Sequence, residues 1–486
     1  MADATATLKL TTHESYLTQT IIQSTSRFFT MRKTIFTLLI CLLFVAGQAQ
    51  NVTITGQTNK ANELIRLYVY EDLLNETGKQ ISECQSDAKG NFLLSGKLSQ
   101  TLSARVFVGL ESVDMVLSPN ATYNIEIIVP EQQENVSYFD KEMPTIVVKH
   151  ATDKGLYRQI IISENITNDY LIDHINQIYR GRQSRYIDSI QATINRELPE
   201  IESDYVKNYN LYRQASIRLA ISADGGKKII NDYFDGKPIL YTNSAYIDLF
   251  KELFSNQFDK TTYDIHALNE AFLTGPKAFK DYLNTDPFMA RNPRLAELIT
   301  IYNLQGLCNA DSETRHYAKA HLEQMKANTQ YAEHRAIITD FFANQNRLAP
   351  GAPAPDISLK DSEGNNVKLS DYKKGLVLLQ FVEGYSPISE QQTSRLSELH
   401  HQWHDSVQIV TIATRDKMEF YKKQFADRGY DWPLLDLGNN ILLLEAYNVK
   451  TFPEYILIGK GNKIAAAPAL TPDRGLEERV RSTYRK

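Results

Sequence analysis

The sequence predicts three folded parts: an N-terminal antiparallel β-sandwich, a helical middle domain and a C-terminal α/β domain. Three observations lead to this multidomain prediction. Apolar and polar residues alternate with period two over most of 50–150, which is typical of strands in a two-sheet domain. The apolar period becomes helical from 151 to 347. From 348 to 486, apolar runs of buried-strand type alternate with helical stretches.

The first 49 residues are predicted to be an extension and an export signal rather than part of a folded domain. Residues 1–30 are polar and rich in Thr and Ser, and we expect them to be a non-structural N-terminal extension. Residues 31–49 have the pattern of a signal peptide: two basic residues follow Met31, an apolar run covers 35–46, and an A-x-A-like cleavage site ends at Ala49. An uncleaved anchor or a buried helix is the alternative for this run. We therefore expect an exported protein of the periplasm or cell envelope, which meets the membrane only through its export signal.

Charge and cysteine content exclude several classes of function. Lys and Arg number 53 against 58 Asp and Glu, so the net charge is −5 and nucleic acid is not an expected partner. The three cysteines, Cys41, Cys84 and Cys308, are far apart and form no C-x-x-C pair. A cysteine-dense disulfide scaffold, a Cys₄ zinc site and a vicinal dithiol centre are thereby excluded. Cleavage would remove Cys41, and the other two would either pair across domains or each lie inert in a core.

In the first domain, four alternating segments and a turn define the expected strands. The turn is Asp87–Phe92, with the pattern D-x-x-G-x-F. The alternating segments are 52–56, 65–70, 104–108 and 123–128.

In the middle domain, two sets of apolar residues recur at helical spacing. An aromatic stripe at this spacing is usually part of a core, and a ligand groove is the alternative. The segment Asp224–Lys228 lacks the spacing of a phosphate-binding loop and is interpreted as a turn between helices. The two sets are Ile187, Ile190, Ile194 and Leu198, and Ile201, Tyr205, Tyr209, Tyr212, Ala215 and Leu219.

The C-terminal part begins near Leu348, where a cluster of prolines at 350–355 marks a domain boundary. Strands and helices then alternate and end in a hairpin and a helix, which predicts a mixed sheet with helices on both faces. The expected elements are strands at 367–370 and 376–382, a helix at 389–404, a strand at 407–413, helices at 417–428 and 441–447, and hairpin strands at 455–458 and 464–467.

Two segments of this part carry a family resemblance. Residues Gly351–Asp356 match the entry pattern G-x-x-A-P-D, and Tyr447–Pro453 resembles a Y-x-V segment that leads to a cis-proline. Together they resemble the thioredoxin-like family, in its exported TlpA-type and AhpC/TSA-related branch. The strands and D-x-x-G-x-F turn of the first domain resemble the β-rich domains attached to such proteins in the Bacteroidetes envelope. The resemblance implies a thioredoxin-like fold and thiol–disulfide exchange.

The resemblance fails at the redox motif. Where the family has W-C-x-x-C, this chain has Tyr385, Ser386, Pro387, Ile388 and Ser389. Exchange needs a thiolate to attack and a second thiol to resolve the mixed disulfide, and serine supplies neither. We therefore predict no catalytic residue at Ser386 or Ser389, which mark the lost redox motif, and we expect one or both to cap the following helix.

The expected function is binding or scaffolding by a redox-inactive domain. We therefore favour a role without enzymatic activity. Family geometry implies a groove lined by Tyr385, Phe452 and Pro453, with extended peptides or other envelope proteins as partners. The alternative is a TlpA-like oxidoreductase that uses Cys84 or Cys308 brought near the groove, or an unrecognised activity in the helical domain.

No cofactor and no metal are expected. His400 and His404 are spaced i, i+4 on a predicted helix, which is compatible with two ligands on one helix face. A third ligand is not evident in the sequence. These histidines are therefore interpreted as part of a solvated helix end.

Overall fold

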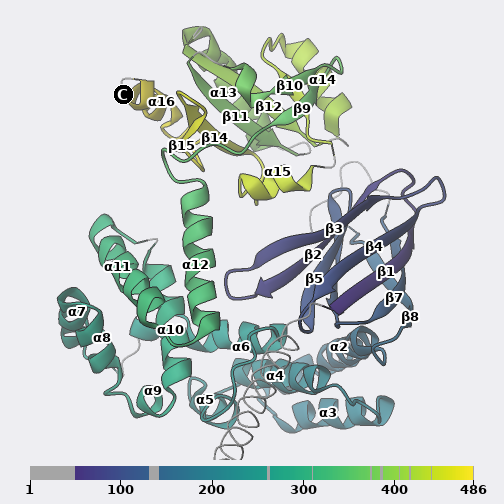
Figure 1. Ribbon diagram of the computed structural model, residues 1–486, viewed down its shortest axis with the longest axis vertical. Helices are drawn as coiled ribbons and strands as arrows, with labels where there is room; N and C mark the ends of the chain where they lie inside the picture. Colours follow the sequence, from purple (N-terminus) through teal and green to yellow (C-terminus); the bar gives the residue numbers. More distant parts are fainter. Residues whose placement is uncertain are drawn as a thin grey trace, which may run out of the picture.

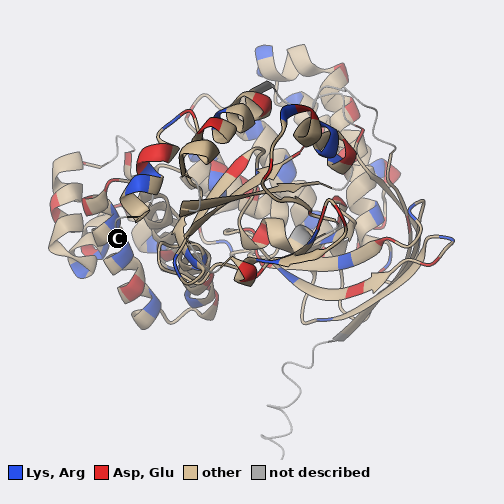
Figure 2. Cartoon of the chain, turned by 90° about the horizontal axis from the view of Figure 1, so that it is seen from above, with Lys and Arg blue, Asp and Glu red and all other residues tan. Residues whose placement is uncertain are grey.

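The computed structural model describes residues 50–130, 142–259, 263–308, 310–372, 375–383, 387–403, 406–414, 417–438 and 440–484. The predicted extension and signal peptide lie outside these residues. In the described part of the chain, no helix is both long and apolar enough to cross a membrane. Figure 1 shows a sheet-rich N-terminal domain, a helical middle and a C-terminal α/β domain. Basic and acidic residues are interspersed along the ribbon in Figure 2.

The N-terminal domain consists of two four-stranded sheets, ordered β4-β1-β7-β8 and β3-β2-β5-β6. Alternate residues of both sheets, such as Ile54 of one and Leu67 of the other, share a single apolar core. The predicted turn at Asp87–Phe92 joins β3 to β4. The strands are β1 (Gln50–Thr58), β2 (Leu64–Asp72), β3 (Thr77–Gln85), β4 (Asn91–Leu98), β5 (Leu102–Val108), β6 (Glu111–Leu117), β7 (Thr122–Ile128) and β8 (Thr145–Ala151).

The expectation of an antiparallel domain is wrong at one pair, because β1 and β7 run parallel, with Thr53 opposite Thr122. The chain leaves β6 in one sheet and enters β7 in the other, in the same direction as β1. A period-two pattern reports which side chains face the core. It does not report strand direction, which is set by this crossing between sheets.

Helices from α2 to α12 form the middle domain. Of the first predicted set, Ile187, Ile190 and Ile194 are buried on α3 against Ile217 of α4. The fourth member, Leu198, follows the last residue of α3 and packs partly buried against the same cluster. The helices are α2 (Leu156–Asp173), α3 (Arg185–Glu197), α4 (Asp204–Ala220), α5 (Lys227–Tyr233), α6 (Ser244–Phe254), α7 (Ile265–Thr274), α8 (Pro276–Leu283), α9 (Pro287–Arg291), α10 (Pro293–Leu307), α11 (Ser312–Asn328) and α12 (Ala332–Arg347), with a π-helical turn η2 (Asn176–Arg180) and a 3₁₀ turn η3 (Gln257–Asp259).

The second predicted set is correct except at its first member. Ile201 lies before α4, which begins at Asp204 after Ser203, so Ile201 is not on the helix. Tyr212 of this set is buried in the main core of the domain. Of the predicted turn Asp224–Lys228, the first three residues lie between α4 and α5, and Lys227 and Lys228 already belong to α5. Gly225 and Gly226 both take the left-handed backbone conformation, which glycine adopts without steric cost.

The turn between β2 and β3 inserts into the helical domain, as Figure 1 shows near α12 and α6. Leu74 at its tip is 7% exposed and belongs to the core of the helical domain. The Nδ2 of Asn75 donates to the carbonyl of Ile337 on α12 at 2.9 Å. The Nζ of Lys251 lies 3.0 Å from Glu76 Oε1. The N-terminal and middle domains are therefore held together by a shared core and by polar contacts around it.

The C-terminal domain has a seven-stranded sheet, ordered β10-β9-β13-β12-β11-β14-β15. Helices α13, α14 and α16 pack on the face that includes Leu378, and α15 packs on the face that includes Leu379. The elements are β9 (Ser358–Asp361), β10 (Asn366–Lys368), the 3₁₀ turn η4 (Leu369–Asp371), β11 (Leu376–Val382), α13 (Pro387–Trp403), β12 (Val407–Ala413), α14 (Met418–Arg428), β13 (Leu434–Asp436), α15 (Ile441–Ala446), β14 (Glu454–Gly459), β15 (Lys463–Ala466) and α16 (Leu476–Tyr484).

Glu445 on α15 is a half-buried carboxyl at the contact between the C-terminal and N-terminal domains. Burial raises its pKa, while a hydrogen bond from Tyr68 and the charges of Arg347, Arg105 and Arg66 act in the opposite direction without cancelling the effect. The charged form of Glu445 is therefore disfavoured in the folded protein.

Glu445→Gln is expected to raise the melting temperature at pH 7 and to leave it nearly unchanged at pH 4. A carboxyl whose folded pKa lies above its unfolded pKa of about 4.3 costs stability as the pH rises from that value through the folded pKa. Glutamine is neutral and has no such cost. Calorimetry at the two pH values measures the effect. The exposed Glu478→Gln is the control and should leave the melting temperature unchanged at both pH values. A lower melting temperature for Glu445→Gln at pH 7 would contradict this account.

Candidate functional site

The candidate groove lies where β11 ends and α13 begins. β14 pairs antiparallel with β11, with Glu454 opposite Phe381. Continuing this register places Pro453 opposite Val382, beside the chain segment that leads into α13. The Phe452–Pro453 peptide bond is cis, as the family resemblance implies. The fold thus brings the residues around 453 to the start of α13, although about 65 positions separate them in the sequence.

Of the three residues predicted to line the groove, two are described. Phe452 and Pro453 are half-buried, and Phe452 packs against the apolar cluster under α15. Tyr385 and Ser386 lie outside the described residues. Glu454, which follows Pro453, has its pKa raised by burial. The described residues at this position therefore combine an aromatic ring with a partly buried carboxyl.

Ser389 lies inside the first turn of α13, which begins at Pro387. Its side chain is buried, and its carbonyl accepts a hydrogen bond from Thr393 Oγ1 at 2.7 Å. A residue in this position cannot be the N-cap, because the N-cap precedes the helix. Ser389 is therefore not the cap, and the other predicted cap, Ser386, lies outside the described residues.

A chain of buried polar side chains runs beneath the start of α13. The Nε2 of Gln380 donates to Thr393 Oγ1 at 2.9 Å and to Tyr455 Oη at 3.2 Å. The Oε1 of Gln380 accepts from Thr411 Oγ1 at 2.8 Å, and Thr411 in turn accepts from Trp432 Nε1 at 2.9 Å. All five side chains are buried. This network fixes β11, β12, β14 and α13 to one another.

The network extends to the surface through Gln392 on α13. Tyr455 Oη donates to Gln392 Oε1 at 3.1 Å, and Gln392 Nε2 donates to Asp473 Oδ1 at 3.0 Å. Sequence reasoning missed these residues. One signal was present: Gln380 is the only polar residue in the buried run Leu376–Val382, and a buried amide needs partners.

The two described cysteines lie far from this site in the fold. Cys84 is on β3 at the edge of the N-terminal core, and Cys308 follows α10 in the core of the helical domain. Both are free thiols, so the predicted alternative of a bridge between them is wrong. Burial raises the pKa of each thiol, which disfavours the reactive thiolate. Each cysteine packs against the apolar core of its own domain, and the two do not form a disulfide.

The histidines considered as metal ligands have different surroundings. His400 Nε2 lies 3.1 Å from Asp431 Oδ1, and its ring meets the Trp432 ring edge-on. His401 is exposed, and His404 lies outside the described residues. No group of three or more His, Cys, Asp or Glu side chains suited to a metal occurs among the residues that the structure describes.

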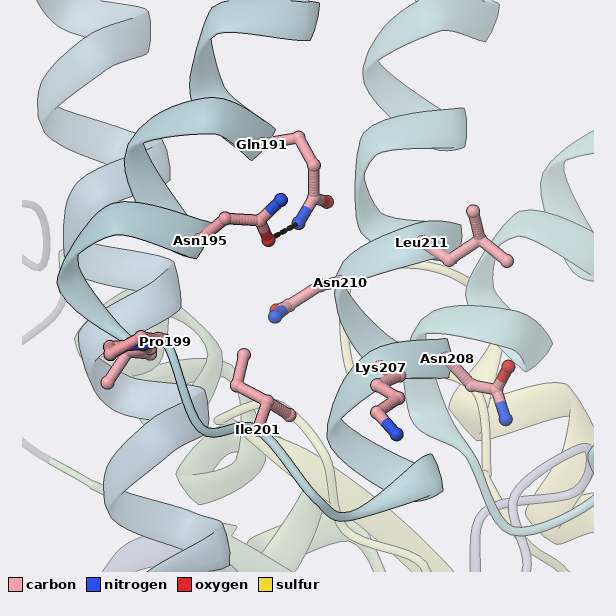
Figure 3. A pocket seen from close by; sticks show the side chains of 9 residues that line it. Gln191, Asn195, Pro199, Ile201, Lys207, Asn208, Asn210 and Leu211 are labelled. Atoms are coloured by element: carbon pink, nitrogen blue, oxygen red, sulfur yellow. Dashed lines mark hydrogen bonds between the residues drawn. The ribbon is translucent and has the colours of Figure 1, made fainter.

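A separate recess of about 380 Å³ lies between α3 and α4, seen in Figure 3. Two of its polar side chains are bonded to each other, and one of these also accepts from a residue outside the lining. Gln191 Nε2 donates to Asn195 Oδ1 at 2.7 Å, and Gln214 Nε2 donates to Gln191 Oε1 at 2.6 Å. The lining residues are Gln191, Asn195, Leu198, Pro199, Ile201, Lys207, Asn208, Asn210 and Leu211.

Comparisons with known proteins concern the C-terminal domain. The model of the AhpC/TSA family matches residues 350–467. The thiol-disulfide oxidoreductase ResA of Geobacillus kaustophilus is 30% identical over 130 residues, which cover 26% of this chain and 74% of that protein. The protein of the same name from Halalkalibacterium halodurans is 26% identical, over 26% of this chain and 73% of its own length.

Among solved structures, the thioredoxin domain of a thiol-disulfide oxidoreductase from Bacteroides vulgatus is 29% identical and matches with a TM-score of 0.25. The match covers 28% of this chain and 97% of that one. The sheet order, the cis-proline before β14 and the sequence matches all indicate a thioredoxin-like fold for the C-terminal domain. Through its C-terminal domain, the chain belongs to the AhpC/TSA family of thioredoxin-like proteins.

Proposed function

We propose that this protein is a redox-inactive, thioredoxin-like protein of the cell envelope that binds or scaffolds other proteins. One observation carries the proposal: the last cysteine of the chain is Cys308, so the family domain from 348 onward contains no thiol. Disulfide exchange transfers electrons through a thiolate and a resolving thiol. The cis-proline Pro453 is retained in a domain that lacks the groups for the family's chemistry.

The location and lineage in this proposal rest on the sequence. The signal-peptide pattern of 31–49 supports export to the periplasm or envelope. Ser386 and Ser389 stand where the resemblance expects the two motif cysteines, which supports a degenerate C-x-x-C motif of Bacteroidetes type. The free thiols Cys84 and Cys308 are consistent with inert core residues.

The binding surface in this proposal is the groove of Tyr385, Phe452 and Pro453. An extended segment of another envelope protein would lie along the backbone before β14, where main-chain groups give affinity and side-chain contacts give selectivity. The half-buried ring of Phe452 supplies apolar contact area next to that backbone.

A second candidate is thiol–disulfide oxidoreduction by Cys84 or Cys308, which the names of the similar proteins favour. Reduction of insulin by dithiothreitol separates the two candidates. The mature wild-type protein should give no turnover above the uncatalysed rate. Ser386→Cys together with Ser389→Cys should give turnover, because the frame of the domain is retained. Wild-type turnover that disappears in Cys84→Ser or Cys308→Ser would instead establish the second candidate.

Phe452→Ala is expected to weaken partner capture at least about fivefold, since truncation of a central aromatic contact typically costs more than 1 kcal/mol. Capture is measured by crosslinking in intact cells followed by quantitative mass spectrometry. Phe420→Ala on α14, where the ring is 39% exposed, is the matched control and should leave capture unchanged. Equal capture by Phe452→Ala, Tyr385→Ala and the wild type would sink the groove proposal.

A further inference from the structure

A carboxylate, an imidazole and a phenol form a row of hydrogen-bonded side chains within the helical domain. The proposed function does not use this cluster. His334, in the first turn of α12, is fully buried. Its Nδ1 lies 2.8 Å from Glu297 Oε1 on α10, and its Nε2 lies 2.8 Å from Tyr241 Oη in the segment between α5 and α6. Three separate elements therefore converge to place a base against a hydroxyl group.

The proton positions follow from the partners of each atom. Glu297 Oε1 also accepts from Thr329 Oγ1. Burial alone would raise the pKa of Glu297, but the hydrogen bonds from His334 and Thr329 outweigh burial and lower it, so the group is a carboxylate and only accepts. Because this carboxylate can only accept, the proton between the two groups is on Nδ1 of His334, and Nε2 is placed to accept the proton of the Tyr241 hydroxyl.

Arg294 completes the surroundings of the phenol oxygen. Its Nε donates to Tyr241 Oη at 3.1 Å, and its guanidinium lies over the rings of Tyr241 and Tyr331. A salt bridge of 2.9 Å to Glu333 fixes the other side of the guanidinium. The Arg294 side chain is 43% exposed, so the cluster reaches solvent. A negative charge that developed on the Tyr241 oxygen would be stabilised by this fixed cation.

We propose that Tyr241 is a nucleophilic tyrosine that accepts acyl groups from aryl esters. Its Oη forms a bond to the acyl carbon, and the bond between that carbon and the aryl oxygen breaks. The phenol proton passes to His334 Nε2 and then to the departing aryl oxide. The products are the O-acylated Tyr241 and the free phenol, without any change in oxidation state.

The division of roles follows the logic of nucleophile, base and orienting carboxylate. Burial raises the pKa of Tyr241 to about 12, so the free phenol is protonated at neutral pH and its attack needs a base in contact. His334 is that base, Arg294 stabilises charge on the oxygen, and Glu297 is a positioning residue that holds the imidazole tautomer.

The test uses p-nitrophenyl acetate with the wild-type chain, followed by stopped-flow absorbance and by mass spectrometry of the digest. We expect a burst of one p-nitrophenolate per protein and an acetyl group on Tyr241. Tyr241→Phe keeps the ring over Arg294 and should abolish the burst. Tyr317→Phe, a half-buried tyrosine of α11 in the same domain, is the matched control and should leave the burst intact.

Two further variants separate reactivity from folding. His334→Gln should slow the burst at least about 100-fold, the usual contribution of a general base. Because His334 is buried, Arg294→Gln at a half-exposed position gives an independent measurement and should slow the burst about tenfold with an unchanged melting temperature. A burst that persists in Tyr241→Phe, acetylation located elsewhere, or an unchanged rate in a folded Arg294→Gln protein would overturn the proposal.

Discussion

Leu74→Ala is expected to lower the free energy of unfolding by about 2–5 kcal/mol, the range for truncating a fully packed leucine. Leu74 belongs to the N-terminal domain by sequence, yet its side chain lies in the core of the helical domain, with Leu249 and Ile338 in the same cluster. The substitution leaves a cavity at the contact between two domains. The loss should therefore appear as earlier unfolding of the helices rather than of the sheets.

Chemical denaturation followed by circular dichroism at 222 nm measures this effect, because most helices of the chain lie between 156 and 347. The matched control is Leu93→Ala on β4. Leu93 is 58% exposed, so its truncation should change the free energy by less than about 0.5 kcal/mol. If Leu74→Ala and Leu93→Ala unfold at the same denaturant concentration, the β2–β3 turn does not hold the two domains together.

Gln380→Leu is expected to destabilise the C-terminal domain by about 2–5 kcal/mol. The amide of Gln380 is fully buried and bonds to Thr393, Tyr455 and Thr411. Leucine has a similar volume but no polar atoms, so the Thr411 hydroxyl loses its acceptor and the Tyr455 hydroxyl loses a donor. Each buried polar group left without a partner costs about 1–3 kcal/mol.

Tryptophan fluorescence measures this loss selectively. The chain has two tryptophans, Trp403 and Trp432, and both lie in the C-terminal domain. Gln391→Leu, at an exposed position of α13, is the matched control and should change the free energy by less than about 0.5 kcal/mol. A fluorescence transition of Gln380→Leu that coincides with that of the wild type would show that the network contributes little to stability.

Long apolar runs were the most predictable part of the fold. The strands Leu376–Val382 and Val407–Ala413 were predicted with their observed bounds, because a buried central strand needs apolar residues at every position. The short strands β9 and β13 were missed. Each has three or four residues, and their pairing with each other depends on tertiary contacts that leave no local pattern.

The candidate groove was predictable only through family resemblance, since nothing local to Phe452 and Pro453 indicates what lies opposite them. The cluster around His334 had no sequence signal. Tyr241, Glu297 and His334 are spread over almost a hundred positions, and α10, α12 and the segment before α6 bring them together. Residues that become neighbours only through packing of separate helices cannot be found by spacing.

The insertion of the β2–β3 turn into the helical domain also sets an order of events during synthesis. Asn75 and the carbonyl group that it binds on Ile337 are 262 positions apart. At a synthesis rate of about 5–20 residues per second, the turn leaves the ribosome roughly 10–50 s before that partner exists. During this interval Leu73 and Leu74 are an exposed apolar tip on an otherwise complete sheet. The first domain to be made therefore offers chaperones a short hydrophobic segment until the helices that cover it, from α6 to α12, have been made.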